Sequence, residues 1–350
     1  MWVNGKKLKI LYVGQLFKGS TALHRCSALQ SFGCEIQAID SSLFTENDIW
    51  KNKLFRFIHS LKVRTNRWID WHRVNEQLLQ ALTIKWDVLW IDKGLQICPG
   101  ILSQFKYRQP MCRLVSYSPD DMFNPANQTK RYLSAITIYD LIVTTKSYNV
   151  DEFKAIGAKD VFFVQKSYEP SVHRPIKLND SEMRQWGCDV CFVGAREEER
   201  EQSIVHLAKN GVSIGLFGDW MHLANRFENV MCHKGFFADE NYAKALCSGK
   251  IGLGFLRKAN RDLQTARSIE LPACGVFMLA ERTDEHLALF EEGKEAAFFC
   301  NDAELIEKVD YYLSHDQERQ AIARAGRERC LQSGYSNADR LREVLNYLYD

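Results

Sequence analysis

The feature that most constrains the fold is a regular alternation of short apolar runs with longer helical stretches along the whole chain. Parallel strands need a long crossover connection, usually a helix, so this alternation predicts parallel, doubly wound α/β sheets. In the first half, the expected strands are residues 9–13, 34–39, 88–91, 113–117, 141–144 and 161–164. In the second half, they are residues 190–193, 212–217, 251–256, 276–279 and 297–299.

A break separates these two series of strands. Residues 167–180 contain Pro170 and Pro175, carry mixed charges and show no apolar periodicity, as is typical of a linker. A chain of 350 residues is long enough for two domains that each bury a core. We therefore predict two Rossmann-like domains, over residues 1–168 and 176–332, whose sheets face a central cleft that is the expected ligand site. Residues 333–350 are expected to pack back on the first domain.

Composition excludes several classes of protein. The net charge of +2 gives no global field that would recruit nucleic acid. No secretory signal is recognisable at the N-terminus, and no run of about 18 uncharged apolar residues occurs. The eleven cysteines are odd in number and scattered, and the C-x-x-C of Cys188 and Cys191 has no second pair. We expect free structural thiols in a reducing, cytoplasmic protein.

Several motifs with defined chemistry are missing. Residues 14–21 look like a phosphate-binding P-loop but lack the lysine directly after the second glycine. No G-x-G-x-x-G follows the first strand, and neither G-x-S-x-G nor H-E-x-x-H occurs. Kinase, dehydrogenase, hydrolase and metalloprotease functions therefore lack their residues. The absence of D-x-D predicts a site without an obligatory divalent metal or other cofactor.

The most informative stretch is residues 267–279, in which a helix bearing Glu270 ends at Gly275 and turns into a buried strand. A carboxylate in that position can accept both hydroxyls of a ribose, and Gly275 permits the tight turn. Asp262 lies on the preceding loop. If the ligand with the ribose is a nucleotide diphosphate and no metal binds it, cations and helix amides must neutralise the charge of the phosphates. The candidates are Arg196, Arg200, Arg257, Lys258 and Arg267, the amides around 265–269, and the strand-end glycines Gly194 and Gly218.

This half of the chain resembles a known family. The pattern R-x-x-E-x-x-A-x-G at 267–275, followed by F-x-x-G-x-E at 290–295, is similar to the signature of group 1 glycosyltransferases. Within that family it is most similar to the CgeB-like, spore-maturation-type branch. Further matching pieces are residues 189–194, Arg200, residues 215–220, Gly235, residues 242–248 and His173–Pro175 at the domain junction. The resemblance covers about residues 160–335.

The resemblance implies a GT-B fold, with the donor in the C-terminal domain, the acceptor against the N-terminal one, and catalysis without an obligatory metal. Glu270 matches the family's ribose-binding glutamate. Asp262 stands where related retaining enzymes have a sugar-contacting glutamate, and it is one methylene shorter. If Asp262 reaches the sugar, retention of configuration is favoured over inversion.

Residues of the first half supply the acceptor side of this hypothesis. Asp120 and Asp121 follow a predicted strand and can act as a base or bind sugar hydroxyls; the alternative is that they cap a helix. Gly14, Gly19 and His24 are expected to line the cleft. Residues 50–73 form a basic stretch interleaved with aromatic side chains. It can lie on an anionic membrane near a lipid-linked acceptor, or it can dock on its own sheet.

Taken together, the sequence predicts a glycosyltransferase that moves a hexose-like sugar from a UDP-linked donor to a glycan, lipid-linked or small-molecule acceptor. It is expected in the cytoplasm, with peripheral contact at the inner membrane face as an option. Two alternatives stay open: a nucleotide-sugar epimerase of the same fold, and a non-catalytic glycosyltransferase-like binding protein.

Overall fold

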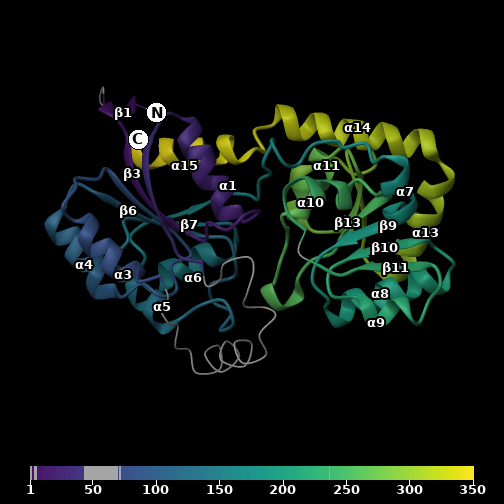
Figure 1. Ribbon diagram of the computed structural model, residues 1–350, viewed down its shortest axis with the longest axis horizontal. Helices are drawn as coiled ribbons and strands as arrows, with labels where there is room; N and C mark the ends of the chain where they lie inside the picture. The colour runs from purple at the N-terminus through teal and green to yellow at the C-terminus, as the bar shows by residue number, and fades with distance from the viewer. Residues whose placement is uncertain (1, 4–5, 43–69, 71, 236) are drawn as a thin grey trace. The chain divides into compact units, whose positions relative to one another are not determined.

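The computed structural model describes residues 2–3, 6–42, 70, 72–235 and 237–350, so that most of the predicted basic stretch at 50–73 lies outside the described residues. The chain divides into two compact units (Figure 1). The N-terminal unit comprises Met1–Gln165 together with Asn337–Asp350, and the C-terminal unit comprises Lys166–Ser336. Among the described residues, no helix is both long and apolar enough to cross a membrane.

The N-terminal unit is built on a six-stranded parallel sheet with the strand order β4-β3-β5-β6-β7-β8. Its strands are β3 (Lys9–Gly14), β4 (Glu35–Asp40), β5 (Val88–Asp92), β6 (Arg113–Ser118), β7 (Leu141–Thr144) and β8 (Val161–Phe163). Its helices are α1 (Thr21–Ser31), α3 (Val74–Ala81), α4 (Pro99–Arg108), α5 (Lys130–Ala135), α6 (Asn149–Ala155) and α15 (Asn337–Tyr349). A short antiparallel ribbon, β1 (Trp2–Val3) with β2 (Lys6–Lys7), precedes the sheet.

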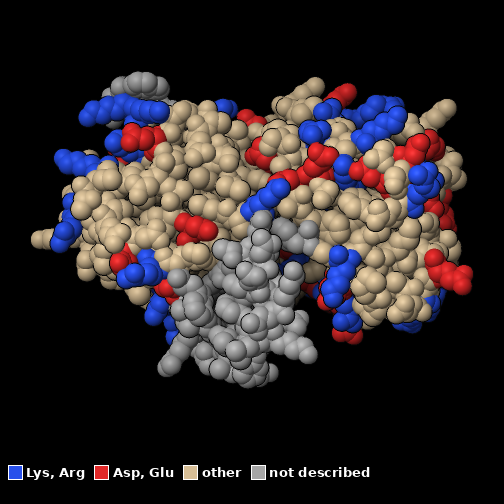
Figure 2. Space-filling model, viewed as in Figure 1, with Lys and Arg blue, Asp and Glu red and all other residues tan. Residues whose placement is uncertain are grey.

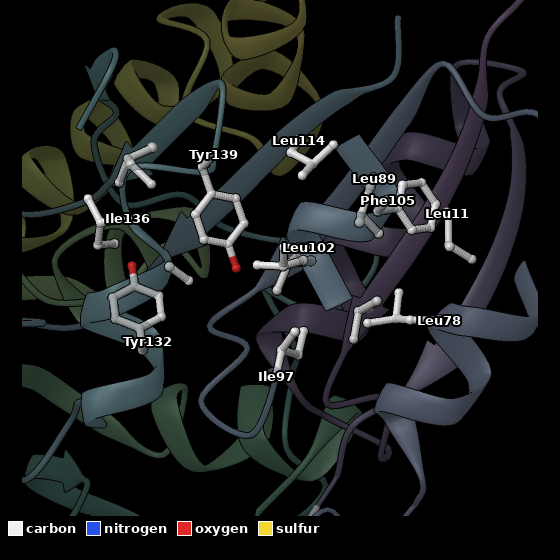
Figure 3. Close-up of a cluster of buried hydrophobic side chains, with 14 of the residues drawn as sticks. Leu11, Leu78, Leu89, Ile97, Leu102, Phe105, Leu114, Tyr132, Ile136 and Tyr139 are labelled. Carbon is white, nitrogen blue, oxygen red and sulfur yellow. The ribbon is translucent and has the colours of Figure 1, made fainter. Parts of the chain in front are cut away.

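Successive side chains of a strand point to opposite faces of the sheet, and the two faces of this one carry separate cores. Leu11 and its neighbours pack under α3, α4 and α5, as the interlocking side chains in Figure 3 show. Ile10 and Tyr12 face the other way, where α1 and α15 cover them. In Figure 1 the last helix, α15, lies beside α1 near the start of the chain. It buries Leu341 and Val344 in the same cluster as Leu29.

The C-terminal unit has a second six-stranded parallel sheet, with the order β11-β10-β9-β12-β13-β14. Its strands are β9 (Cys188–Val193), β10 (Ile214–Phe217), β11 (Val230–His233), β12 (Gly249–Gly254), β13 (Phe277–Glu281) and β14 (Ala297–Phe299). Its helices are α7 (Asp180–Trp186), α8 (Glu198–Lys209), α9 (Met221–Ala224), α10 (Asp239–Leu246), α11 (Arg267–Ala273), α12 (Asp284–Leu289), α13 (Asp302–Ser314) and α14 (Asp316–Gln332). The predicted strands all occur, whereas β11 was not predicted.

The order of the second sheet determines where a ligand site is expected. From β9 the chain proceeds outward to β10 and β11, and it then returns to place β12 on the other side of β9. The loops after β9 and β12 therefore run in opposite directions. In open α/β sheets such a switch point, at the carboxyl ends of the strands, is where ligands bind. The residues around Gly194 and Leu256 occupy it.

Candidate functional site

Arg200, in α8, ties together the two loops of the switch point. Its side chain is buried, and Nε and Nη2 donate to the carbonyl oxygen of Leu256 at 3.1 and 2.9 Å. Nη1 donates to the carbonyl oxygen of Ala195 at 3.0 Å. Leu256 follows β12 and Ala195 follows β9, so one guanidinium fixes both loops. The sequence predicted that Arg200 binds the phosphates of the donor. In the structure, much of its hydrogen-bonding capacity is directed to the backbone instead.

Arg267 lies at the start of α11 and reaches over the end of β9. Its Cζ is 5.6 Å from the ring centroid of Phe192, and the Cζ of Arg200 lies at the same distance from that ring. A Cβ placed on Gly194 would be 3.6 Å from the Cζ of Arg267. The Nε of Arg267 is buried and has no hydrogen-bond partner among the described residues. An unpaired buried guanidinium nitrogen is costly, so a bound anion would stabilise this arrangement.

Two further arginines and two acids act electrostatically on Arg200. Burial lowers the pKa of Arg200, and the positive charges of Arg267 and Arg257 lower it further. Glu197 and Asp262 act in the opposite direction but do not restore the usual value. Near the carboxyl ends of β9 and β12, the guanidinium groups of Arg200, Arg257 and Arg267 thus outnumber the carboxylates of Glu197 and Asp262. Such an excess of positive charge favours an anion.

The two remaining predicted cations, Arg196 and Lys258, lie at the flanks and have acidic partners. Arg196 pairs with Glu201, and Lys258 pairs with Glu281 at the end of β13. Arg257 also has a carboxylate partner, Glu197 at 3.0 Å. These cations are about half exposed, at 53%, 54% and 48% for Arg196, Lys258 and Arg257. Figure 2 shows the same mixture, with acidic and basic side chains interspersed over the visible face of the C-terminal unit. Exposed pairs of this kind are weak, so a polyanionic ligand can replace the carboxylate partner.

Gly194 and Gly218, both predicted at strand ends, are brought together by the structure. Gly218 has a φ of +145°. A Cβ on this residue would lie 2.5 Å from the carbonyl oxygen of Gly194. The same oxygen accepts a hydrogen bond from Nε1 of the buried Trp220 at 2.9 Å. The loop after β9 therefore packs directly on the loop after β10.

Replacing Gly218 by alanine is expected to lower the free energy of unfolding by about 1–3 kcal/mol, because the new methyl group meets a fixed backbone oxygen. Gly211→Ala is the matched control. Gly211 also has a positive φ, +80°, but open space surrounds its Cβ position. Thermal unfolding of the two variants separates the clash from backbone strain. Equal losses of stability would contradict the close packing of Gly218 on Gly194.

Glu270, the predicted ribose ligand, is buried at 4% exposure and already has two side-chain neighbours. Oε2 accepts a hydrogen bond from the hydroxyl of Tyr242 at 2.5 Å, and Oε1 lies 3.5 Å from Nε2 of His173. Burial raises the pKa of Tyr242 well above its usual value, and the charge of Glu270 raises it further, so the hydroxyl stays protonated. From the sequence, Tyr242 is only the first residue of a stretch that matches the family, without a role in the site, and His173 is only a junction residue.

Some donor-side predictions meet a different geometry. Gly275 has a φ of +72° and follows the end of α11. It precedes β13 and so lies at the amino-terminal ends of the strands, whereas Gly194 and Gly218 lie at the carboxyl ends. The expectation of free amides at 265–269 is wrong for three of them. The amides of Thr265, Ser268 and Ile269 donate to the Ser268 hydroxyl, the Thr265 carbonyl and the Ala266 carbonyl. Asp262 is half-buried on the loop before α11, within electrostatic range of Arg200.

The two predicted acids of the N-terminal unit lie in different environments. Asp121 is buried, and its Oδ1 accepts hydrogen bonds from the Phe123 amide and the Asn149 side chain, both at 3.0 Å. The alternative from the sequence was a helix cap, whereas the structure places Asp121 in a turn before α5. Asp120 is 30% exposed and pairs with Lys93 at 2.7 Å. Of the two, Asp120 is the more accessible to a substrate.

Gly14 lies above a buried ion pair that the sequence did not reveal. Arg25 in α1 binds Asp92 at the end of β5 through two hydrogen bonds, of 2.7 and 3.1 Å. A Cβ on Gly14 would lie 3.3 Å from the Cβ of Asp92 and 2.8 Å from the Tyr12 ring. Gly14 therefore lets α1 and β5 approach each other closely. Gly19 has a φ of +79°, and His24 is half-buried in α1.

Comparison with known proteins decides the fold family. Residues 196–346 match the family model described as glycosyl transferase-like. Sucrose-phosphate synthase from Thermosynechococcus elongatus superposes with a TM-score of 0.64 at 11% identity, over 97% of this chain and 98% of that one. Anabaena HepE, in complex with UDP and glucose, gives a TM-score of 0.61 at 13% identity, over 97% and 99%. The fold is that of the GT-B glycosyltransferases.

The chain is also similar in fold to a protein with a different described activity. A UDP-N-acetylglucosamine 2-epimerase, described as putative, from Listeria monocytogenes gives a TM-score of 0.56 at 11% identity, over 98% of this chain and 96% of that one. No curated protein sequence matches the chain. The predicted fold class is confirmed, and residues 196–346 are similar to the glycosyl transferase-like family. Its place in the CgeB-like branch stays a prediction.

Proposed function

We propose that this GT-B protein transfers a sugar from a UDP-linked donor, bound by its C-terminal unit, to a glycan, lipid-linked or small-molecule acceptor. The observation that carries the proposal is the convergence of Arg200, Arg257 and Arg267 at the switch point between β9 and β12. Such a cluster complements the diphosphate that leaves when the glycosidic bond breaks. The structures of HepE with UDP and with UDP-glucose support UDP as the nucleotide.

In this proposal Arg267, with its unpaired Nε, makes the direct contact with the diphosphate. Arg200 holds the loops in place, and Glu270 accepts the ribose hydroxyls. Asp262 reaches the sugar, and the reaction proceeds with retention and without an obligatory metal. Asp120, Gly14, Gly19 and His24 are the proposed acceptor-side residues. Cytoplasmic localisation and membrane contact through residues 50–73 belong to the same proposal.

A panel of UDP-, GDP-, ADP- and CMP-sugars tests the donor by thermal shift. A matched donor at 100 times its Kd is expected to stabilise the protein by about 2.7 kcal/mol. UDP-glucose should stabilise the wild type, and Arg267→Ala should abolish the shift at the same concentration. EDTA should leave the shift unchanged. A larger shift with a GDP- or CMP-sugar would overturn the choice of UDP.

The epimerase alternative makes a different product. Incubation with UDP-sugar alone converts the donor to its epimer if the protein is an epimerase, because that reaction needs no acceptor. A glycosyltransferase leaves the sugar configuration of the donor unchanged and transfers the sugar only when an acceptor is added. Nuclear magnetic resonance of the sugar protons distinguishes the two. An epimer formed from donor alone would reject the glycosyltransferase proposal.

A further inference from the structure

The carboxylate of Glu270 is held from two sides by residues that come from separate segments. Tyr242 reaches Oε2 from α10, and His173 faces Oε1 from the segment that precedes α7. Both Glu270 and His173 are buried, each at 4% exposure. The tyrosine and histidine rings also touch each other edge to face, with centroids 5.6 Å apart at 71°. The carboxylate, the phenol and the imidazole form one packed cluster.

The hydrogen bonds of His173 fix its tautomer. Its Nδ1 accepts a hydrogen bond from the backbone amide of Glu169 at 2.9 Å. A ring nitrogen that accepts carries no proton, so the proton of the neutral imidazole is on Nε2. That nitrogen is the one that faces Oε1 of Glu270. His173 therefore presents a donor to the carboxylate.

Tyr242 presents the second donor. Its hydroxyl is kept protonated by burial and by the charge of Glu270, which together raise the pKa of Tyr242. The positive charge of Arg267 acts on the same hydroxyl and offsets part of this rise. Ala243 and Leu246, on the same helix, are buried in the core and fix α10 in place. The phenol therefore reaches Glu270 from a rigid support.

The two neighbours leave acceptor capacity on the carboxylate unused. An ionised carboxylate offers about four lone-pair sites for hydrogen bonds. Tyr242 uses one site on Oε2, and Nε2 of His173 lies 3.5 Å from Oε1, so each oxygen keeps at least one site for another donor. The 2′- and 3′-hydroxyls of a ribose are two adjacent donors that match such a pair of sites. A carboxylate that is held at both oxygens also loses less rotational freedom when it binds them.

We propose that Tyr242 and His173 are positioning residues that orient the carboxylate of Glu270 for the vicinal diol of the donor's ribose. This inference rests on the proposed function. It deepens that function by assigning ribose discrimination to a three-residue cluster. It predicts that loss of either donor weakens the recognition of the 2′-hydroxyl in particular, without a general loss of nucleotide binding.

The test compares the Kd of UDP with that of 2′-deoxy-UDP by isothermal titration calorimetry. A hydrogen bond to a charged group is worth about 1.5–3 kcal/mol, so wild type is expected to prefer UDP by roughly 10-fold or more. Tyr242→Phe removes only the hydroxyl and is expected to reduce this preference to about 3-fold or less. Tyr335→Phe is the matched control, since it also removes a buried hydroxyl, which donates to the Leu289 carbonyl at 2.8 Å. It should keep the wild-type preference.

Variants of His173 keep the test decisive if Tyr242→Phe fails to fold. His173→Gln retains a donor and should preserve the preference for UDP, whereas His173→Leu should lose it. Glu270→Gln distinguishes two claims: that Glu270 binds the ribose, and that Tyr242 and His173 position its carboxylate. If Glu270→Gln keeps the wild-type preference, Glu270 is not the ribose ligand and that part of the proposed function fails. If Glu270→Gln loses the preference while Tyr242→Phe and His173→Leu keep it, only the positioning role is overturned.

Discussion

Asp92→Ala is expected to destabilise the N-terminal unit by about 3–5 kcal/mol, because it leaves the buried guanidinium of Arg25 without its counter-charge. Arg25 and Asp92 are exposed by only 5% and 4%. Their two hydrogen bonds are joined by a third, from the Tyr12 hydroxyl to Asp92 at 3.0 Å. Burial alone would lower the pKa of Arg25, but the charge of Asp92 raises it above its usual value. The pair is thus strongly coupled.

Urea unfolding measures the loss, and hydrogen exchange of the β3 and β5 amides assigns it to this unit. Glu35→Ala is the control from the same sheet. It breaks the exposed pair between Lys9 and Glu35, which are 42% and 55% exposed. It should cost about 0.5 kcal/mol or less. The double variant Arg25→Met/Asp92→Leu should recover most of the loss, since both charges are then gone. A cost of Asp92→Ala no larger than that of Glu35→Ala would contradict a coupled buried pair.

Arg267→Ala is expected to lower kcat with UDP-glucose by about 100-fold to 1,000-fold, the usual cost of removing one donor aimed at developing charge. Its buried Nε has no hydrogen-bond partner among the described residues, and we propose that the leaving diphosphate supplies one. Arg267→Lys keeps the charge but loses the planar pair of donors and should give an intermediate rate.

Lys250→Ala is the control for this loss of charge. Lys250 is 54% exposed and pairs with Asp189 at 2.7 Å, at the amino-terminal ends of the strands, away from the switch point. Initial rates at saturating donor should be unchanged in this variant. If the kcat of Arg267→Ala is no lower than that of Lys250→Ala, the cation at 267 takes no part in the reaction.

The alternation of strands and helices was sufficient to predict both sheets, because every crossover leaves a buried apolar run next to an amphipathic segment. Strand β11 escaped because it lies at the edge of its sheet. Of its four residues only Val230 is buried, so the run reads as mixed. Edge strands lack the continuous apolar pattern of central parallel strands.

The candidate site was predictable only in outline. Strand ends followed by arginines pointed to the carboxyl ends of β9 and β12, and the structure places Arg200 and Arg257 there. Which cations converge depends on partners that only the fold supplies, such as Glu201 for Arg196 and Glu281 for Lys258. Asp120 and Asp121 are neighbours in sequence, yet one is accessible and the other caps a turn. Tyr242 begins a stretch that matches the family, but nothing in the sequence indicated a role for its hydroxyl, because an aromatic residue on an amphipathic helix normally belongs to the core.

The position of α15 has a consequence for biosynthesis. This helix is made of residues 337–349, yet it completes the core over α1, which is synthesised near the beginning. The C-terminal unit is contiguous from 166 to 336 and can fold as soon as it leaves the ribosome. The first unit, although translated earlier, must wait for α15 with one face of its sheet covered by α1 alone. During that interval part of its apolar core stays exposed to water.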